Sequence, residues 1–375
     1  MWLHNSLFRI NGCVDMSKRG KRRARAQARE NTGGSNDSAS IADPTPRKSH
    51  DPSISLFHYT TASGLIGIVS SNSLWATHAR FLNDTAECQL LSHQLIPQIE
   101  SEFRALLPKL MERGAFTPDV MELAKGNGLR HESERATTAI QNAIDGASPI
   151  HITSFCRHRA DSAECEHGLL SQWRGYAQGG FAIEFDEREL DDLIDEEYAR
   201  HSYQVLISRR VEYENHEKAA GRENFVGLGA ACLRAAFELK SPKLATKPEI
   251  KKLLGNRDMT EFIRPFIHVV PFLKSPRFSE ENEYRVVALP TRTQAQIDDA
   301  RDARSWKEIH FREGYGGAIV PYIKLFDNLN KRLPIKRVIV GPHRDQDNQL
   351  LAAKMVLQRH GFDVPMVRSD TSLRP

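Results

Sequence analysis

Four short segments combine imidazole, aromatic, guanidinium and carboxylate groups within a few residues of predicted strand ends. They are residues 56–60 (LFHYT), 74–84 (LWATHARFLND), 171–177 (SQWRGYA) and 280–285 (EENEYR). Groups of these types can bind a polar small molecule or act on it, provided that the fold brings them into one cleft. No single segment is specific, so their joint occurrence carries the functional hypothesis.

Each segment also has a purely structural interpretation. His58 at a strand end can simply bond to a backbone carbonyl. Trp173 and Tyr176 are three residues apart and can form the apolar side of a helical turn. Glu283 and Arg285 share one side of a predicted strand and can pair with neighbouring charges there.

A second set of candidate ligands, Cys156, His158, Cys165 and His167, falls within one short stretch of the chain. One residue separates the members of each pair, whereas zinc-binding pairs are usually separated by about two to four. We therefore assign no metal site. The chain also has no GxSxG, P-loop or HExxH pattern, which weakens hydrolase, NTPase and zinc-protease interpretations.

Strands and helices that could position these segments follow from apolar periodicity. Helix formers dominate residues 87–145 and 214–254, and residues 348–360 predict an amphipathic helix. Alternation and β-branched or aromatic content predict strands at residues 56–60, 74–76, 149–156, 180–186, 267–273, 284–289, 317–323 and 337–340.

The helical blocks between these strands differ in length, which favours an α+β fold over a regular doubly wound one. We predict a mixed, mostly antiparallel sheet with helical insertions. A single α+β domain is predicted over residues 51–375, with the insertions near 87–145 and 214–260.

Composition excludes some protein classes. The chain has 375 residues, of which 40% are hydrophobic and 27% charged, as in ordinary globular proteins. No stretch approaches the roughly 20 apolar residues of a membrane-spanning helix, and the first 15 residues lack the apolar centre of a secretory signal. Five scattered cysteines indicate no disulfide framework, so we predict a cytoplasmic protein that does not associate with membranes.

The basic residues are concentrated in an N-terminal tail. The formal net charge of +4 divides into +6 for residues 1–50 and −2 for the rest. Because the tail is poor in apolar residues, we predict that it is disordered. Its Lys18–Arg25 run could contact nucleic acid. We favour a solubilising tail, or translation that starts at Met16 and leaves residues 1–15 untranslated.

The order of the motifs HYT, SLWAT, FLND, WRGYA, GGFAIEFD, ENEYRVV and IKRVIVGP resembles that of the bacterial domain of unknown function 2971 family. The resemblance extends over residues 54–365 and is carried by short blocks. Members of that family recur in phage-defence settings, so the resemblance implies a bacterial protein with such a role.

A weaker resemblance connects the chain to ADP-ribosyltransferases, whose plan is a histidine, a tyrosine and a late glutamate. It implies that His58 bonds to ribose hydroxyls, that Tyr176 stacks on nicotinamide and that Glu283 stabilises the cationic sugar formed as the glycosidic bond breaks. Glu281 is the nearest substitute for Glu283. The residues that would hold the dinucleotide are Tyr59, Thr60, Arg80, Trp173, Arg174 and Arg285.

Two functional hypotheses follow. The first is an NAD-utilising ADP-ribosyltransferase-like enzyme, with NAD as substrate and an unidentified acceptor. The alternative is a non-catalytic module that binds a nucleotide or senses a phage component. The sequence leaves open whether the chain is catalytic and what its oligomeric state is.

Overall fold

The computed structural model describes most of the chain after the basic tail. The described residues are 50–82, 85–115, 118–123, 125–147, 149–215, 218, 225–257, 260–291 and 304–371. The predictions on tail disorder, nucleic-acid contact and the start of translation concern residues that lie outside this set, except for His50. Within it, no helix has the length and apolar character needed to cross a membrane.

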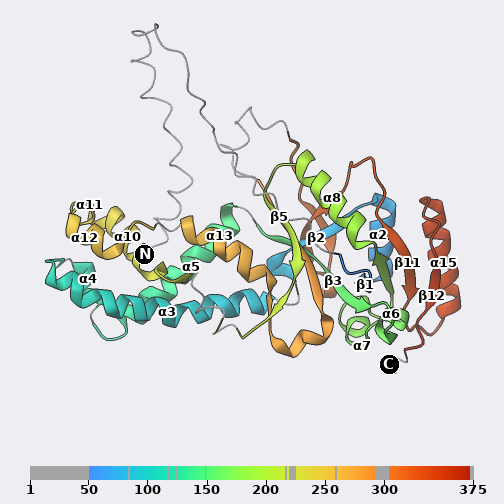
Figure 1. Ribbon diagram of the computed structural model, residues 1–375, viewed down its shortest axis with the longest axis horizontal. Helices are drawn as coiled ribbons and strands as arrows, with labels where there is room; N and C mark the ends of the chain where they lie inside the picture. Colours follow the sequence, from blue (N-terminus) through green and yellow to red (C-terminus); the bar gives the residue numbers. More distant parts are fainter. Residues whose placement is uncertain are drawn as a thin grey trace, which may run out of the picture.

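The strands of a ten-stranded sheet lie in the right half of the view in Figure 1. Its strands are β1 (Ile54–Thr60), β2 (Leu74–His78), β3 (His151–Arg159), β4 (Phe181–Phe185), β5 (Tyr203–Arg210), β8 (Glu283–Pro290), β9 (His310–Glu313), β10 (Ile319–Leu325), β11 (Ile335–Val340) and β12 (Met366–Arg368). The main path is β12-β11-β4-β1-β3-β2-β10-β9, and β8 joins β3 to β5 beside it. Strands β11 and β12 pair in parallel, whereas the other described pairs in this sheet are antiparallel. The predicted α+β class with a mixed, mostly antiparallel sheet is thus confirmed.

Strand β3 has three neighbours, and the sheet forks along it. One edge of β3 pairs with β8. On the other edge, Ile152 lies opposite Thr77 of β2 and Cys156 lies opposite Phe57 of β1. Ser154, halfway between, has a partner in neither strand, because β1 turns away to follow β4. We call this gap between β1 and β2 the fork.

Helices cover both faces of the sheet. One face packs against α2 (Ala62–Ser71), α8 (Glu187–Arg200) and α15 (Gln346–Arg359). A small core on the opposite face lies under α6 (Ala163–His167), α7 (Leu170–Gln172) and the π-helical turn η3 (Trp173–Ala177). That face also supports a helical lobe, which extends away from the sheet in Figure 1. Its helices are α3 (Thr85–Glu112), α4 (Pro118–Leu123), α5 (Gly128–Ala147), α10 (Leu228–Lys240), α11 (Pro242–Ala245), α12 (Pro248–Leu254) and α13 (Thr260–Val269).

The two predicted helical blocks pack against each other in this lobe. The Glu102 carboxylate of α3 accepts hydrogen bonds from the backbone N–H groups of Gly227 and Gly229, both at 2.8 Å, at the start of α10. A carboxylate placed there satisfies N–H groups that have no partner within the helix and interacts favourably with the helix dipole. This contact joins parts of the chain that are far apart in sequence.

The prediction of a strand at Ile267–Leu273 is wrong. The segment contains the end of α13, a 3-10 turn (Val270–Phe272) and the first residue of the two-residue strand β7 (Leu273–Lys274). A short apolar run is compatible with either a buried strand or a buried helix, and here its side chains join the core of the helical lobe. Helix α8 and strand β5 were not predicted.

Candidate functional site

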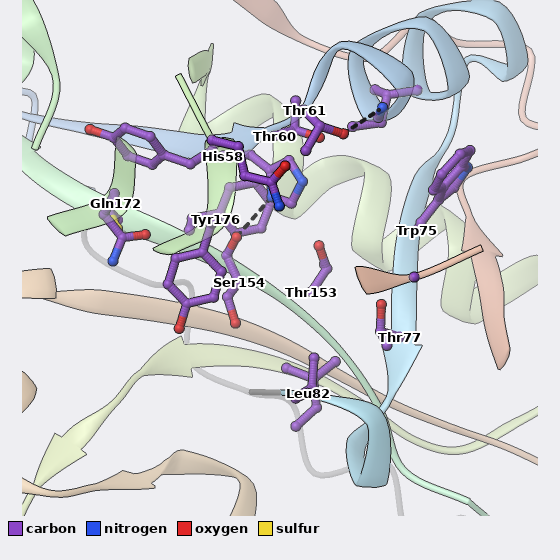
Figure 2. Close-up of a pocket in the computed structure, with 18 of the residues that line it drawn as sticks. His58, Thr60, Thr61, Trp75, Thr77, Leu82, Thr153, Ser154, Gln172 and Tyr176 are labelled. Carbon is purple, nitrogen blue, oxygen red and sulfur yellow. Dashed lines mark hydrogen bonds between the residues drawn. The ribbon is translucent and has the colours of Figure 1, made fainter. Parts of the chain in front are cut away.

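A cavity of about 740 Å³ opens at the fork (Figure 2). Its walls include the end of β1, the first turn of α2, parts of β2 and β3, and the end of β9 that contains Arg312. The predicted catalytic residues His58, Tyr176 and Glu283 all line it, although they lie far apart in the chain. A cavity of this size can enclose a nucleotide.

The cavity connects the two faces of the sheet. His58 alternates with Phe57 along β1, so it lies on the face covered by α2, as Leu56 does. Glu283 lies opposite Cys156, whose side chain belongs to the core on the other face. These residues can line one cavity because the fork leaves an opening in the sheet.

His58 is held in one tautomer. Its Nδ1 lies 2.9 Å from the backbone carbonyl oxygen of Ser154, the residue at the fork. Because a carbonyl only accepts hydrogen bonds, Nδ1 carries the proton and Nε2 has the free lone pair. Burial lowers the pKa of His58 below its ordinary value of 6.5, and the positive charge of Arg312 lowers it further, while the bond to Ser154 opposes them. Neutral His58 can therefore accept a hydrogen bond from a ligand.

Glu283 belongs to a buried charge cluster that we define as Lys274, Glu281, Glu283 and Arg285. The Arg285 guanidinium donates to both Glu283 oxygens, at 2.7 and 2.9 Å. Lys274 Nζ donates to Glu281 at 2.7 Å and to Glu283 at 3.2 Å. Burial alone would raise the pKa of Glu283, but Arg285 and Lys274 lower it to about 2. The carboxylate is thus ionised at neutral pH, and the formal charges of the cluster cancel.

Tyr59 lines the cavity, but its hydroxyl is used inside the protein. The oxygen accepts a hydrogen bond from the Leu169 N–H at 2.7 Å, and the hydroxyl donates to His158 Nε2 at 2.9 Å. Its ring packs edge-on against Trp173, with centroids 5.0 Å apart. Tyr59 therefore fixes the segment that carries Gln172 and Tyr176 against β1.

The π-helical turn η3 separates the side chains of Trp173 and Tyr176. Trp173 is fully buried, and its indole N–H donates to the His167 carbonyl at 3.0 Å. Tyr176 is 36% exposed and lines the cavity, where Figure 2 shows its ring near Ser154. Arg174 is exposed and is not among the residues that line the cavity.

The cationic group at the cavity is Arg312 rather than the predicted arginines. Arg80 is exposed on a 3-10 turn outside the cavity wall, and Arg285 is engaged by Glu283. Arg312 lies on β9, donates to the Thr77 hydroxyl at 3.2 Å and has its guanidinium 5.9 Å from the centre of the Trp75 ring. The sequence offers no motif around Arg312, so only the pairing of β9, β10 and β2 identifies it.

Two deeply buried side chains of the cavity wall carry polar atoms without a partner among the described residues. They are the hydroxyl oxygen of Thr153 and the amide nitrogen of Gln172. Thr153 is 3% exposed, and Figure 2 shows its oxygen pointing toward Thr60 and Thr61. Buried polar groups are nearly always hydrogen-bonded in native proteins, so these atoms indicate where a polar ligand would bind. Thr60, a predicted ligand residue, also lines this part of the wall.

A second charge cluster lies away from the cavity. Glu197, His201 and Asp327 are close enough together to hold a metal ion. However, the Lys307 ammonium pairs with both Glu197, at 2.7 Å, and Asp327, and the Tyr203 hydroxyl donates to Glu197 at 2.6 Å. The lysine thus already supplies the positive charge at this position.

The Cys/His pairs considered for zinc have other contacts. Cys156 is buried beside the charge cluster, and burial raises its thiol pKa well above the ordinary value of 9.0. His158 accepts from Tyr59, and Cys165 contacts the Arg337 guanidinium at 3.2 Å. Within the described residues the four do not form a common ligand group.

Comparison with known proteins gives one match. Residues 172–286 match the family model described as "Protein of unknown function (DUF2971)". No curated protein and no solved structure matches the chain. The matched segment contains Gln172, Tyr176 and Glu283 of the cavity wall. The predicted resemblance to the domain of unknown function 2971 family is therefore confirmed for residues 172–286.

Proposed function

We propose that the cavity binds a nucleotide and that NAD is the first ligand to test. One observation carries this proposal: His58, Tyr176 and the unpartnered polar atoms of Thr153 and Gln172 all belong to one cavity of nucleotide size. Small-molecule sites are typically concave and have a few converging polar groups.

The groups in the wall match the parts of a nucleotide. The lone pair of His58 Nε2 can accept a hydrogen bond from a sugar hydroxyl. The half-exposed Tyr176 ring offers a face for stacking on a base. Gln172 has an amide group that can donate to ring or carbonyl acceptors.

NAD cleavage by an ADP-ribosyltransferase-like reaction is the second candidate. It is favoured by the shared location of His58, Tyr176 and Glu283 in one cavity, since that reaction needs a carboxylate beside the ribose as positive charge develops. The ion pairs of Glu283 weigh against catalysis, because Arg285 and Lys274 already neutralise the carboxylate. Binding therefore ranks above catalysis.

Titration and product analysis test both candidates. We expect NAD to bind the full chain in calorimetry and to raise its melting temperature through mass action. Release of nicotinamide from NAD, abolished in Glu283→Gln with binding retained, would establish the catalytic candidate. Binding without cleavage leaves the nucleotide-binding module. Absence of binding by NAD, ADP-ribose, ADP and AMP would refute the proposed function.

A cytoplasmic location, a role in phage defence and nucleic-acid contact through the tail stay predictions of the same hypothesis. Phage challenge of cells that produce the unaltered chain, compared with cells that produce the His58→Ala variant, would connect the cavity to defence. We expect protection to fall with the variant if nucleotide binding is part of that role.

A further inference from the structure

We infer that the cavity contains an anion subsite between Arg312 and the first turn of α2, which binds a phosphate or diphosphate group. This inference rests on the proposed function in one respect: the anion would bind in the same cavity as the proposed nucleotide. It adds which end of a nucleotide would lie there and which residues would hold it.

The charge of Arg312 has no carboxylate partner among the described residues. Burial lowers its pKa from the ordinary value, and no carboxylate contributes to the shift. A guanidinium stays protonated in proteins despite such a shift. The neighbouring Glu313 also lines the cavity, but it is exposed and forms no ion pair with Arg312 in the described part of the chain. Arg312 is therefore a cation available to a ligand.

The first turn of α2 forms another part of the wall. Thr61 caps the helix by accepting from the Gly64 N–H at 3.3 Å, and Thr61, Ser63 and Gly64 all line the cavity. The N–H groups of a first helical turn have no acceptor within the helix and carry a partial positive charge, which favours anions.

The Trp75 ring contacts both Arg312 and helix α2. A Cβ atom at Gly67 would lie 2.2 Å from the indole ring, so the ring lies directly against the helix only because residue 67 is glycine. Arg312 lies over the same ring.

Thr153 supplies independent evidence for a ligand here. Its hydroxyl is buried, has no partner among the described residues and points toward the start of α2. A hydroxyl in this position can donate to a phosphate oxygen. A guanidinium, helix N–H groups and a hydroxyl together form a donor set suited to phosphate.

Pyrophosphate is the probe that tests the subsite directly. We expect it to bind the full chain in calorimetry, with an affinity at least about tenfold lower in Arg312→Gln and an intermediate affinity in Arg312→Lys, because lysine keeps the charge but not the planar fork. Arg359→Gln, at an exposed position on α15, is the matched control and should bind as the unaltered chain does. Equal affinities of Arg312→Gln and the unaltered chain, or absence of pyrophosphate binding, would overturn the inference.

A second variant covers the case in which Arg312→Gln fails to fold. Thr61 has extended backbone (φ −74°, ψ 172°), which suits a residue before proline. Ala62→Pro therefore removes one N–H of α2 at a position where proline fits. We expect it to lower the affinity for pyrophosphate severalfold, whereas unchanged affinity would exclude the helix from the subsite.

Adenosine, AMP and ADP separate this inference from the proposed function. If both hold, affinity rises from adenosine to ADP, and Arg312→Gln removes most of the rise. If pyrophosphate binding depends on Arg312 but ADP and AMP bind no more tightly than pyrophosphate does, the anion subsite stands and the proposed function fails. If adenosine binds as tightly as ADP, the nucleotide cavity stands and the anion subsite fails.

Discussion

The two ends of the cavity use their charged and polar groups in opposite ways. At the Glu283 end, two carboxylates and two cations satisfy one another at 2.7–3.2 Å. At the α2 end, Arg312 has no carboxylate partner within the described residues and the Thr153 hydroxyl has no partner there. Fully paired buried charges hold a structure together, whereas unpaired donors raise its energy until a ligand binds.

This contrast changes the importance of the residues at the site. Glu283, which the motif pattern placed at the centre of the chemistry, has a defined structural task. Arg312 and Thr153, which belong to no motif, retain unused hydrogen-bonding capacity. Variants at the two ends should therefore affect different measurements, with stability at one end and ligand affinity at the other.

The largest effect is expected from breaking the paired end. Lys274→Met leaves Glu281 and Glu283 with less compensation in a buried position, and we expect a loss of about 3–5 kcal/mol in the free energy of unfolding. Denaturant titration measures it. Lys336→Met removes an exposed partner of Glu184 and should change stability by at most about 1 kcal/mol. Similar losses in both variants would mean that the cluster is no more important than a surface pair.

A pH titration of stability separates the histidines from the carboxylate. Burial lowers the pKa of His158 from 6.5 to about 4. As the pH falls, His158 therefore takes up a proton in the unfolded chain before it does so in the folded protein. The contribution of neutral His158 to stability is complete above pH 6.5 and is lost as the pH falls through about 4. The difference corresponds to roughly 3 kcal/mol. The loss attached to Glu283 begins only below its ordinary value of 4.5 and continues to about pH 2.

His158→Gln tests the histidine part of this profile. The variant should lose the His158 part of the decline between pH 6.5 and 4 and keep the part that comes from His58, while His343→Gln, at an exposed position, should keep the whole decline. A profile that is identical in the two variants would assign the decline to other groups.

An intermediate effect is expected at His58. Replacing the imidazole by the amide of His58→Gln disturbs the bond to Ser154 and the acceptor at Nε2. We expect affinity for NAD to fall about tenfold, as for one well-placed hydrogen bond, with a stability change of about 1 kcal/mol or less. Calorimetry and denaturant titration report the two quantities separately, and loss of stability without loss of affinity would contradict a ligand role for His58.

The smallest effect on stability is expected at Thr153. Its hydroxyl has no protein partner to lose, so Thr153→Val should leave the free energy of unfolding within about 0.5 kcal/mol while weakening NAD binding severalfold. Tyr203→Phe is the contrasting case, because its buried hydroxyl bonds to Glu197, and it should cost about 1.5–3 kcal/mol. A marked destabilisation by Thr153→Val would show that the hydroxyl is used within the protein.

Alternation and apolar content predict much of the sheet. Strands β1, β3, β4 and β8 lie close to their predicted positions because each has one or two buried faces. The error at residues 267–273 arises because a short apolar segment lacks a decisive period. The positions of these strands depend on local composition, which can be read from a single sequence.

The site depends on pairing, which local composition does not encode. The cavity exists because β1 and β2 pair with different parts of β3, on either side of Ser154. Arg312 reaches Thr77 only through the register of two further strands. The structural interpretation of Glu283 and Arg285 as an ion pair was available from their spacing. The pairing of Lys274 with Glu283 was not, because no local pattern in the sequence brings these two residues together.

The indole rings give the chain an internal optical reporter. Trp173 is enclosed, and Cβ atoms at Gly168 and Gly341 would lie within 2.8 Å of its ring. Trp75 borders the cavity beneath a guanidinium. Emission from the first should change only when the fold opens, and emission from the second should respond to whatever enters beside it. Among the four tryptophans of the chain, these two can thus report occupancy and unfolding without an added label.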